Sequence, residues 1–371
     1  MIHRIGPLPG SEIARRSGLS PQTVSVILRE LEAEGLMARG EPQRGKVGKP
    51  SVPMGISPDG AFAVGLKLGR RSSDLFLVDL MGDVRYEDRI TYRYPTPTDI
   101  LNFLDDGLAE INRILGPVGK KRICGIGIAT PFEIWKWPEI VGAPPEAMAG
   151  WETLDLVAEI GRFSDLPVLL ENDATAACRA EHVFGRGREF RDFAYFFVAS
   201  FIGGGIVLNH SIFEGPHANA GAFGSLPVSG PSGEPLQLID VASLHLLDSK
   251  LVKAGVDPQN LWQPGAMWDA YESHVDEWVN ETAPYLARAA LTVCAVVDFE
   301  AVLIDGAFPP SVREKLVART RHEMERLDSR GLFPPAIEEG IVGANARAPG
   351  AASFPIFSRY LLNTHGMLSI A

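Results

Sequence analysis

The sequence predicts an α/β protein in which an N-terminal winged helix-turn-helix precedes a larger body built from two similar lobes. Two observations lead to this fold class. Residues 10–39 show a helix, a glycine turn, a second helix and the start of a strand, and strands alternate with helices after residue 61. The strand–turn–strand opening of the body is weakly echoed from residue 193, which indicates related lobes. We place the head at residues 1–55 and the body at residues 56–371.

Charge is distributed unevenly along the 371 residues. Residues 1–50 contain eight lysines and arginines and five glutamates, a net charge of +3, so the other 321 residues carry −14 of the total of −11. A small basic head on an acidic body indicates that DNA contact is confined to the head. No apolar run reaches the roughly 18 residues of a membrane span, and the N-terminus lacks the apolar stretch of a secretory signal. We therefore expect a cytoplasmic protein that does not contact a membrane.

The head begins with two short helices separated by a glycine turn. We expect Ser11 to cap a first helix that ends at Ser17, before Gly18, because glycine accepts the positive φ of a tight turn. Ser20 and Pro21 then start a second helix, with serine as the N-cap and proline at the first helical position. The second helix has one apolar face. The residues that form this face at helical spacing are Val24, Ile27, Leu28 and Leu31.

A helix-turn-helix places the N-terminal residues of its second helix against base edges in the major groove. Polar side chains lie off the apolar face of this helix. Basic side chains follow in the Gly- and Pro-rich stretch 40–55, which we expect to form a hairpin tip, the wing, running into a linker. Glutamine suits adenine, and the cations of the wing suit phosphate. The predicted DNA-binding residues are Gln22, Thr23, Ser25 and Arg29 on the helix and Arg44, Lys46 and Lys49 on the wing.

An alternative interpretation keeps the same helices but makes the head a small module for protein interaction, with Ala14, Leu19 and Val24 as its core. The order of helix, glycine turn, cap, helix and basic hairpin favours DNA. A winged helix normally has a full helix before Ser11, and the sequence MIHRI is too short to supply it. We expect the chain to begin inside that helix.

The body is expected to alternate strands and helices. We expect strands at 61–69, 73–84, 85–94, 122–131, 166–173, 193–200, 206–215 and 301–308, and helices at 99–115, at 174–184 and within 236–297. Residues 203–205, all glycine, are expected to form a turn between two of these strands. Cys124, Cys178 and Cys294 lie far apart in the sequence and are expected to be buried free thiols.

Several segments resemble the ROK family of repressors, open reading frames and kinases. They are TVSVILRELEAEGL with VGKP in the head, LENDATAACRAEHVFGRG at 170–187 and GGGIVLNHSIFEG at 203–215. The resemblance covers nearly the whole chain. It implies an actin-like, ribonuclease-H-like body of two lobes with a ligand cleft, and assembly as a homodimer or homotetramer. Members of this family with such a head are sugar-responsive repressors, and members without it are sugar kinases.

Two positions that a kinase of this family needs have changed. The resemblance implies an acidic residue in the first glycine turn, where it helps to hold Mg²⁺, but Lys67 occupies this turn. The second phosphate turn should be rich in glycine, so that backbone N–H groups reach phosphate, but the matching stretch 199–203 contains Phe201. We therefore expect no enzyme activity, no catalytic residues and no cofactor. The alternative for Lys67 is a direct contact with phosphate.

Part of the sugar site that the resemblance implies is retained. Asp173 matches the general base of the family, Asn172 matches a sugar-binding neighbour, and Pro131 remains from the first sugar loop, although Phe132 stands where glycine is usual. We predict that Asn172, Asp173 and Pro131 bind a ligand. An aspartate after a strand also commonly caps a helix, and that structural role is compatible with ligand contact.

Other parts of the family's sugar and zinc sites are absent from the sequence. The ExGH motif falls on the sequence AFGS at 222–225, so its glutamate and histidine are missing, and the zinc loop that should follow has no cysteine. His217 and His245 lie nearby, and we expect them to be surface or capping residues rather than metal ligands. We expect no metal. The ligand is then another sugar, a sugar derivative or none.

Three functions are consistent with the sequence. The first is a transcriptional regulator, acting as a repressor, that binds a double-stranded DNA operator and responds to a sugar or sugar-like effector. The second is an active sugar kinase with an added head. The third is a constitutive DNA-binding protein whose body only dimerises. The head and the two changed kinase positions favour the first.

Overall fold

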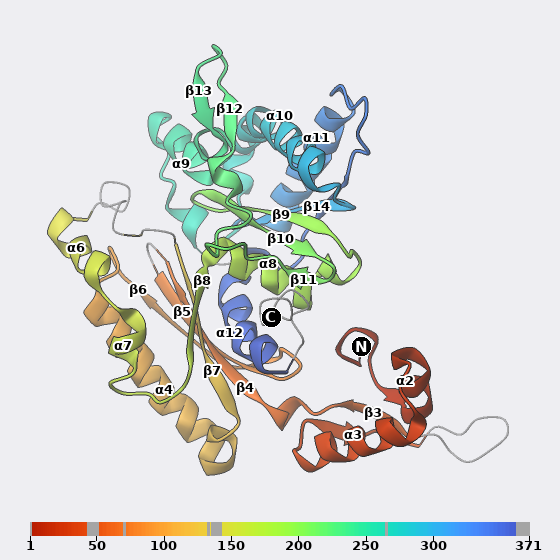
Figure 1. Cartoon of the computed structure of the whole chain (residues 1–371). Coiled ribbons are helices and arrows are strands. Elements are labelled where there is room, and N and C mark those ends of the chain that lie inside the picture. The colour runs from red at the N-terminus through yellow and green to blue at the C-terminus, as the bar shows by residue number, and fades with distance from the viewer. Residues whose placement is uncertain are drawn as a thin grey trace. The chain divides into compact units, whose positions relative to one another are not determined.

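The computed structural model describes residues 2–42, 52–69, 72–131, 134, 143–263 and 266–360. The chain divides into two compact units, whose elements are drawn in Figure 1. The first unit comprises residues 1–128, 133–170 and 352–361, and the second comprises residues 129–132, 171–351 and 362–371. The head therefore belongs to the same unit as the first lobe of the body.

Helices α1 (Ile2–Ile5), α2 (Gly10–Ser17) and α3 (Pro21–Ala33) and strands β1 (Leu8–Pro9), β2 (Met37–Arg39) and β3 (Pro53–Ile56) form the head. The strands make an antiparallel sheet in the order β1-β3-β2. A helix-turn-helix beside such a sheet is a winged helix, as the sequence predicts. The last residues of the predicted linker form β3 instead. The wing residues Arg44, Lys46 and Lys49 lie outside the described residues.

The turn between α2 and α3 has the geometry that its sequence predicts. Gly18 has a φ of 72°, in the left-handed region that glycine tolerates. Ser20 caps α3, because its hydroxyl accepts a hydrogen bond of 3.1 Å from the backbone nitrogen of Thr23. The predicted cap at Ser11 is wrong, since α2 begins at Gly10 and its N-cap residue is Pro9. Pro9 also ends β1, so the helix starts directly where the strand stops.

The first lobe contains a five-stranded sheet in the order β6-β5-β4-β7-β8. Its strands are β4 (Phe62–Leu68), β5 (Ser72–Asp79), β6 (Val84–Thr91), β7 (Ile123–Thr130) and β8 (Val168–Asn172), and its helices are α4 (Pro97–Lys120), α6 (Pro145–Thr153) and α7 (Leu156–Ile160). Helix α4 packs on the sheet through one face, as its helical spacing of apolar residues requires. The buried residues of that face are Ile100, Leu104, Leu108 and Ile111.

The second lobe repeats this arrangement with the order β11-β10-β9-β14-β15. Its strands are β9 (Phe193–Val198), β10 (Ile202–Leu208), β11 (Ser211–Ile212), β14 (Ala301–Gly306) and β15 (Ala336–Glu339), with a separate hairpin of β12 (Pro227–Ser229) and β13 (Pro235–Gln237). The helices are α8 (Asp173–Phe184), α9 (Leu244–Lys253), α10 (Glu272–Val297) and α11 (Pro310–Met324), and α12 (Arg347–Tyr360) begins in the second unit and ends in the first. Strands β9 to β11 are antiparallel, and β14 and β15 are parallel to β9. The two lobes are therefore related, as the internal echo in the sequence predicts.

The predicted glycine turn at residues 203–205 is wrong, because these residues lie inside β10 and pair with β9. The turn comprises Ala199, Ser200 and Phe201 instead. The glycines are needed because α8 lies against this strand. A Cβ atom added at Gly203 would lie 2.7 Å from the Cβ of Ala174, and one added at Gly205 would lie 2.5 Å from the Cβ of Cys178. The run of glycine thus marks a close helix–strand contact.

All three cysteines are buried and free of disulfides, as predicted. Burial raises the pKa of the Cys178 thiol above its ordinary range. Among the helices of the described residues, none is long and apolar enough to span a bilayer.

Gly205→Ala is expected to lower the free energy of unfolding by about 1–3 kcal/mol, because the new methyl group must displace α8 from β10. Gly150→Ala is the matched control, since a Cβ atom there meets ordinary contacts 3.5 Å away on an exposed face of α6. Chemical denaturation of the full chain measures both. A Gly205→Ala variant as stable as the control would contradict this packing.

Candidate functional site

The exposed face of α3 carries the side chains predicted to read DNA. Gln22, Ser25 and Arg29 are exposed and lie three and four residues apart, so they share one face of the helix. The Arg29 Nε atom donates a hydrogen bond of 3.1 Å to the backbone oxygen of Ser25, which holds the arginine along this face. Thr23 is also exposed, but its hydroxyl lies 2.8 Å from the Ser20 hydroxyl at the cap. Thr23 is thus held at the cap of the helix.

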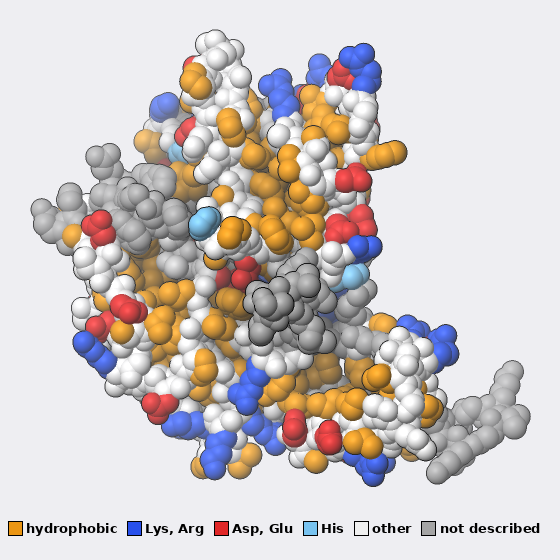
Figure 2. All heavy atoms as spheres, viewed as in Figure 1, with side chains coloured by type: hydrophobic (Ala, Val, Ile, Leu, Met, Phe, Trp, Pro, Cys, Tyr) orange, Lys and Arg blue, Asp and Glu red, His pale blue; other side chains and the backbone are white. Residues whose placement is uncertain are grey.

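The apolar face of α3 is narrower than predicted. Val24 is buried, but Ile27, on the predicted apolar face, has 38% of its surface exposed. Val26 is 46% exposed and lies between Gln22 and Arg29 on the predicted reading face. Figure 2 shows apolar side chains on the surface of the head, among Lys and Arg side chains. In the sequence, Val26 can be recognised as an apolar residue that lies outside the predicted apolar face of the helix.

Asn172 and Asp173 lie where β8 ends and α8 begins. Asn172 is the N-cap of α8, since its Oδ1 atom accepts a hydrogen bond of 2.9 Å from the backbone nitrogen of Ala174. The structural role suggested for Asp173 therefore belongs to Asn172, one residue earlier. Asp173 is the first residue of the helix. Pro131 is buried just after β7, and Phe132 lies outside the described residues.

Asp173 forms an ion pair with Arg347, the first residue of α12. The Arg347 Nη1 atom lies 2.9 Å from Asp173 Oδ2, and the side chains are 14% and 19% exposed. The guanidinium also lies over the ring of Phe197, 5.4 Å from its centroid. A general base must offer its carboxylate to a substrate hydroxyl, and one of the two oxygens is already bound here. The sequence offers no local signal for Arg347, because the fold alone brings together residues so far apart in the chain.

A buried arginine holds α8 to the segment 203–215. Arg179 is 4% exposed, and its Nη2 atom lies 3.1 Å from Glu171 and 3.1 Å from Glu214. Burial raises the pKa of Glu171, although the positive charge of Arg179 opposes this effect. Arg179 thus joins the segments 170–187 and 203–215, both of which carry the family resemblance.

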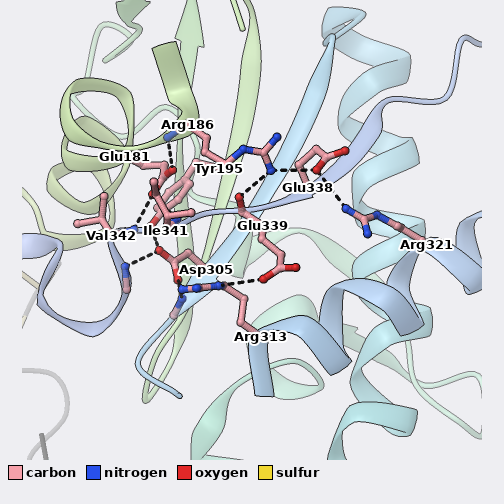
Figure 3. Close-up of polar contacts among 12 residues, drawn as sticks. Glu181, Arg186, Tyr195, Asp305, Arg313, Arg321, Glu338, Glu339, Ile341 and Val342 are labelled. Carbon is pink, nitrogen blue, oxygen red and sulfur yellow. Dashed lines mark hydrogen bonds and ion pairs between the residues drawn. The ribbon is translucent and has the colours of Figure 1, made fainter. Parts of the chain in front are cut away.

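A second buried network holds the chain just before α12 (Figure 3). Glu181 Oε2 accepts hydrogen bonds of 3.0 and 3.1 Å from the backbone nitrogens of Ile341 and Val342. Asp305 Oδ2 accepts one of 2.7 Å from the backbone nitrogen of Gly343. Arg313 lies 3.1 Å from the other oxygen of Asp305. Burial raises the pKa of Glu181, and the nearby Asp305 adds to this effect. The start of α12 is therefore fixed to β14 and α8.

Lys67 lies at the end of β4 and is paired across the sheet with Asp74 of β5. Its Nζ atom lies 2.7 Å from Asp74 Oδ2, and Arg89 binds the other oxygen of the same carboxylate. Burial alone raises the pKa of Asp74, but Lys67 and Arg89 outweigh it and the pKa lies below its ordinary value. The positive charge of Lys67, in the predicted metal turn, is thus balanced by the carboxylate of Asp74.

The turn between β9 and β10 is attached to the start of α9. The backbone oxygens of Ala199 and Ser200 accept hydrogen bonds of 3.0 and 3.2 Å from the first two backbone nitrogens of α9. The ring of Phe201 packs against His245, with centroids 5.0 Å apart. The turn therefore directs carbonyl oxygens and an aromatic ring to α9, where a phosphate site would need free N–H groups.

The histidines follow the predicted interpretation. The Nδ1 atom of His245 lies 3.2 Å from the backbone oxygen of Ser200, so it reinforces the start of α9, and His217 is exposed. In the part of the chain that the structure describes, no three His, Cys, Asp or Glu side chains come together in a group that could hold a metal ion. Phe223, at the position of the missing glutamate motif, is buried with its ring centroid 4.9 Å from that of Phe196.

Comparison with known proteins shows which families the two parts of the chain resemble. Residues 63–236 match the profile of the ROK family, and residues 1–43 match the profile of the MarR family. The chain carries a ROK-family domain behind a winged helix-turn-helix. It is 25% identical to uncharacterized protein y4fQ of Sinorhizobium fredii over 94% of this chain and 87% of that protein. It is 25% identical to the xylose repressor of Caldicellulosiruptor bescii over 78% of this chain and 72% of that protein. The chain is 26% identical to the DNA-binding transcriptional dual regulator NagC of Escherichia coli over 63% of this chain and 57% of that protein.

Solved structures share the fold of this protein. A ROK family transcriptional regulator, a homologue of the E. coli MLC protein, has a TM-score of 0.67 at 21% identity and covers 96% of this chain and 92% of its own. A ROK hexokinase from Thermus thermophilus has a TM-score of 0.57 at 21% identity and covers 78% of this chain and 96% of its own. At these identities the likeness establishes the fold alone.

The Asp173–Arg347 pair is expected to contribute a coupling energy of about 1–2 kcal/mol to the stability of the protein, because both side chains are largely buried. A double-mutant cycle with Asp173→Asn and Arg347→Met, read by chemical denaturation, measures it. The control is the cycle on the exposed pair Asp328–Arg330, whose two substitutions are expected to have additive effects because solvent screens the pair. Fully additive effects at Asp173 and Arg347 would disprove the coupling.

Proposed function

We propose that this protein is a sequence-specific DNA-binding transcriptional regulator, acting as a repressor, whose affinity for its operator changes when a sugar or sugar-like effector binds. The observation that carries the proposal is the winged helix-turn-helix with an exposed polar face on α3. The charge distribution supports it, because a net charge of +3 in residues 1–50 is joined to an acidic remainder. The names of two relatives, a xylose repressor and NagC, favour the same function.

Helix α3 enters the major groove with its exposed face toward the bases. The Gln22 amide can pair with adenine, and Arg29 can pair with guanine or with phosphate. Val26 adds methyl groups to the same face, which suit the methyl group of thymine. The cations of the wing, Arg44, Lys46 and Lys49, bind phosphate and position the head. A homodimer or homotetramer would present two heads to a palindromic operator.

Asn172 and Asp173 contact the effector. Since the Oδ1 atom of Asn172 accepts the capping hydrogen bond, its amino group is the part able to donate to a ligand. The Asp173 carboxylate accepts hydrogen bonds. An adjacent donor and acceptor suit neighbouring hydroxyl groups, as in a sugar or a polyol, and Pro131 supplies an apolar surface. The effector class follows from these groups and from the sugar-related names of the relatives.

The arrangement of the former kinase positions argues against phosphoryl transfer. Lys67 is bound to Asp74, Asp173 is bound to Arg347, and the turn with Phe201 is bound to α9. All three of these positions thus have a partner within the protein. The likeness to hexokinase supports the fold and not the reaction. The tests below also distinguish the proposed regulator from the two alternatives, an active kinase and a constitutive DNA-binding protein.

Arg29→Ala is expected to weaken binding to the DNA sequence that the wild-type protein prefers by about 1–3 kcal/mol, because the guanidinium reads a base or holds a phosphate. The double variant Gln22→Ala/Arg29→Ala is expected to lose more. Fluorescence anisotropy with the full chain measures the affinities at fixed salt. Arg330→Ala is the control, since this arginine is exposed in the second unit. Unchanged affinity of the double variant would exclude α3 as the reading helix.

A sugar, sugar phosphate or polyol is expected to change operator affinity by about 5- to 150-fold, and the same compound with ATP and Mg²⁺ is expected to give no turnover near 1 per second. Asp173→Asn is expected to remove the response, because the ligand loses its charged acceptor. Titration of a compound panel against the operator complex, with a parallel assay of ADP release, measures both. Sugar-dependent turnover would favour the kinase, and operator binding that no compound affects would favour the constitutive protein.

A further inference from the structure

Helix α12 is the one continuous helix of the described residues that belongs to both units. It begins at Arg347 in the second unit and ends at Tyr360 in the first, with the boundary between residues 351 and 352. Its first residue binds Asp173 of the effector site, at 2.9 Å. Its last turns belong to an apolar cluster that includes residues of the head.

The cluster at the end of α12 joins this helix to the head. Ile356 of α12 and Leu36 of the head are both buried members of it, and Tyr360 packs against it. Leu31 packs against the same cluster, and this residue belongs to α3, the proposed reading helix. Leu36 also accepts a hydrogen bond of 2.9 Å from the backbone nitrogen of Ser57, where the head joins the body. The last turns of α12 and the C-terminal part of the reading helix thus pack in the same cluster.

The other end of α12 has one firm anchor and one incomplete contact. The firm anchor is the buried network in which Glu181 and Asp305 bind residues 341–343 (Figure 3). The incomplete contact is Arg347 itself. Its Nη1 atom binds Asp173, but its buried Nε atom has no hydrogen-bond partner within the described residues. A buried donor without a partner is costly, so this contact is easier to exchange than a fully satisfied one.

We propose that α12 transmits the state of the effector site to the head, and that the Arg347–Asp173 ion pair is the contact that the effector releases. This inference rests on the proposed function. A ligand hydroxyl donates to the Asp173 carboxylate and replaces the Arg347 guanidinium there. The first turn of α12 is then free to move, and its last turns repack in the cluster with Leu31 and Leu36. The state with the pair intact binds DNA, and the effector favours the state with the pair broken.

Cys124 provides a reporter at the head end of α12. It is a buried member of the same cluster, 5% exposed, and Tyr360 of α12 packs against this cluster. Burial raises the pKa of its thiol, so it reacts slowly while the cluster is closed. Cys178 and Cys294 are buried outside this cluster and serve as internal controls in the same molecule.

The test measures the alkylation rate of each cysteine by mass spectrometry of the full chain, without DNA or effector. Arg347→Met and Asp173→Asn are expected to raise the rate at Cys124 by about fivefold or more and to weaken operator binding by about 5- to 150-fold. Arg347→Lys retains a cation for Asp173 and is expected to remain near the wild type in both measurements. Arg330→Met breaks an exposed pair in the second unit and is expected to change neither.

The outcomes separate this inference from the proposed function. A Cys124 rate equal to that of the wild type in both Arg347→Met and Asp173→Asn overturns the route through α12, whatever happens at DNA. An equal rise at all three cysteines also overturns it, because the variants would then loosen the whole chain. If the wild-type protein binds no operator, the proposed function fails, while the Cys124 comparison still decides whether α12 responds to the pair.

Discussion

Close packing around α8 is the constraint on which the rest of the second unit depends. Ala174, Ala176 and Cys178 have small side chains, and each faces a glycine. In β10, Gly203 faces Ala174 and Gly205 faces Cys178. A Cβ atom added at Gly350 of α12 would overlap the backbone of Ala176. A larger residue at any of these places would force α8 away from β10 or α12. The ion pair between Asp173 at the start of α8 and Arg347 at the start of α12 follows from this contact.

The body shares the fold of a ROK hexokinase, and three groups at positions that the family resemblance relates to kinase chemistry have partners within the protein. The ammonium of Lys67, the carboxylate of Asp173 and the carbonyls of the turn before β10 all have intramolecular partners. Phosphoryl transfer requires groups that are preorganised toward metal and phosphate, whereas the proposed regulator does not require them. A binding site that changes shape when a ligand replaces one partner needs no such preorganisation. This difference explains how one fold can serve a regulator as well as an enzyme.

Local signals in the sequence predicted much of the fold. Gly18, Ser20 and Pro21 act through neighbouring residues, so the turn and the cap of α3 could be derived from the sequence. An error came where tertiary packing decided the outcome: the glycines at 203–205 serve a helix contact and not a turn. Ile27 lies exposed although its spacing fits the apolar face. Asn172 and Asp173 were found through resemblance. Arg347 had no local signal, because its partner lies in another element of the fold, far away in the sequence.

The central claim is that the exposed face of α3 reads DNA in a symmetric assembly. Selection of bound sequences from a random pool of double-stranded DNA by the full-length protein tests it most directly. The account predicts enrichment of one sequence with two inverted half-sites, whose centres are separated by one or more helical turns of roughly 10 base pairs. A pool that remains random after repeated selection, at a salt concentration where nonspecific binding is weak, would contradict it.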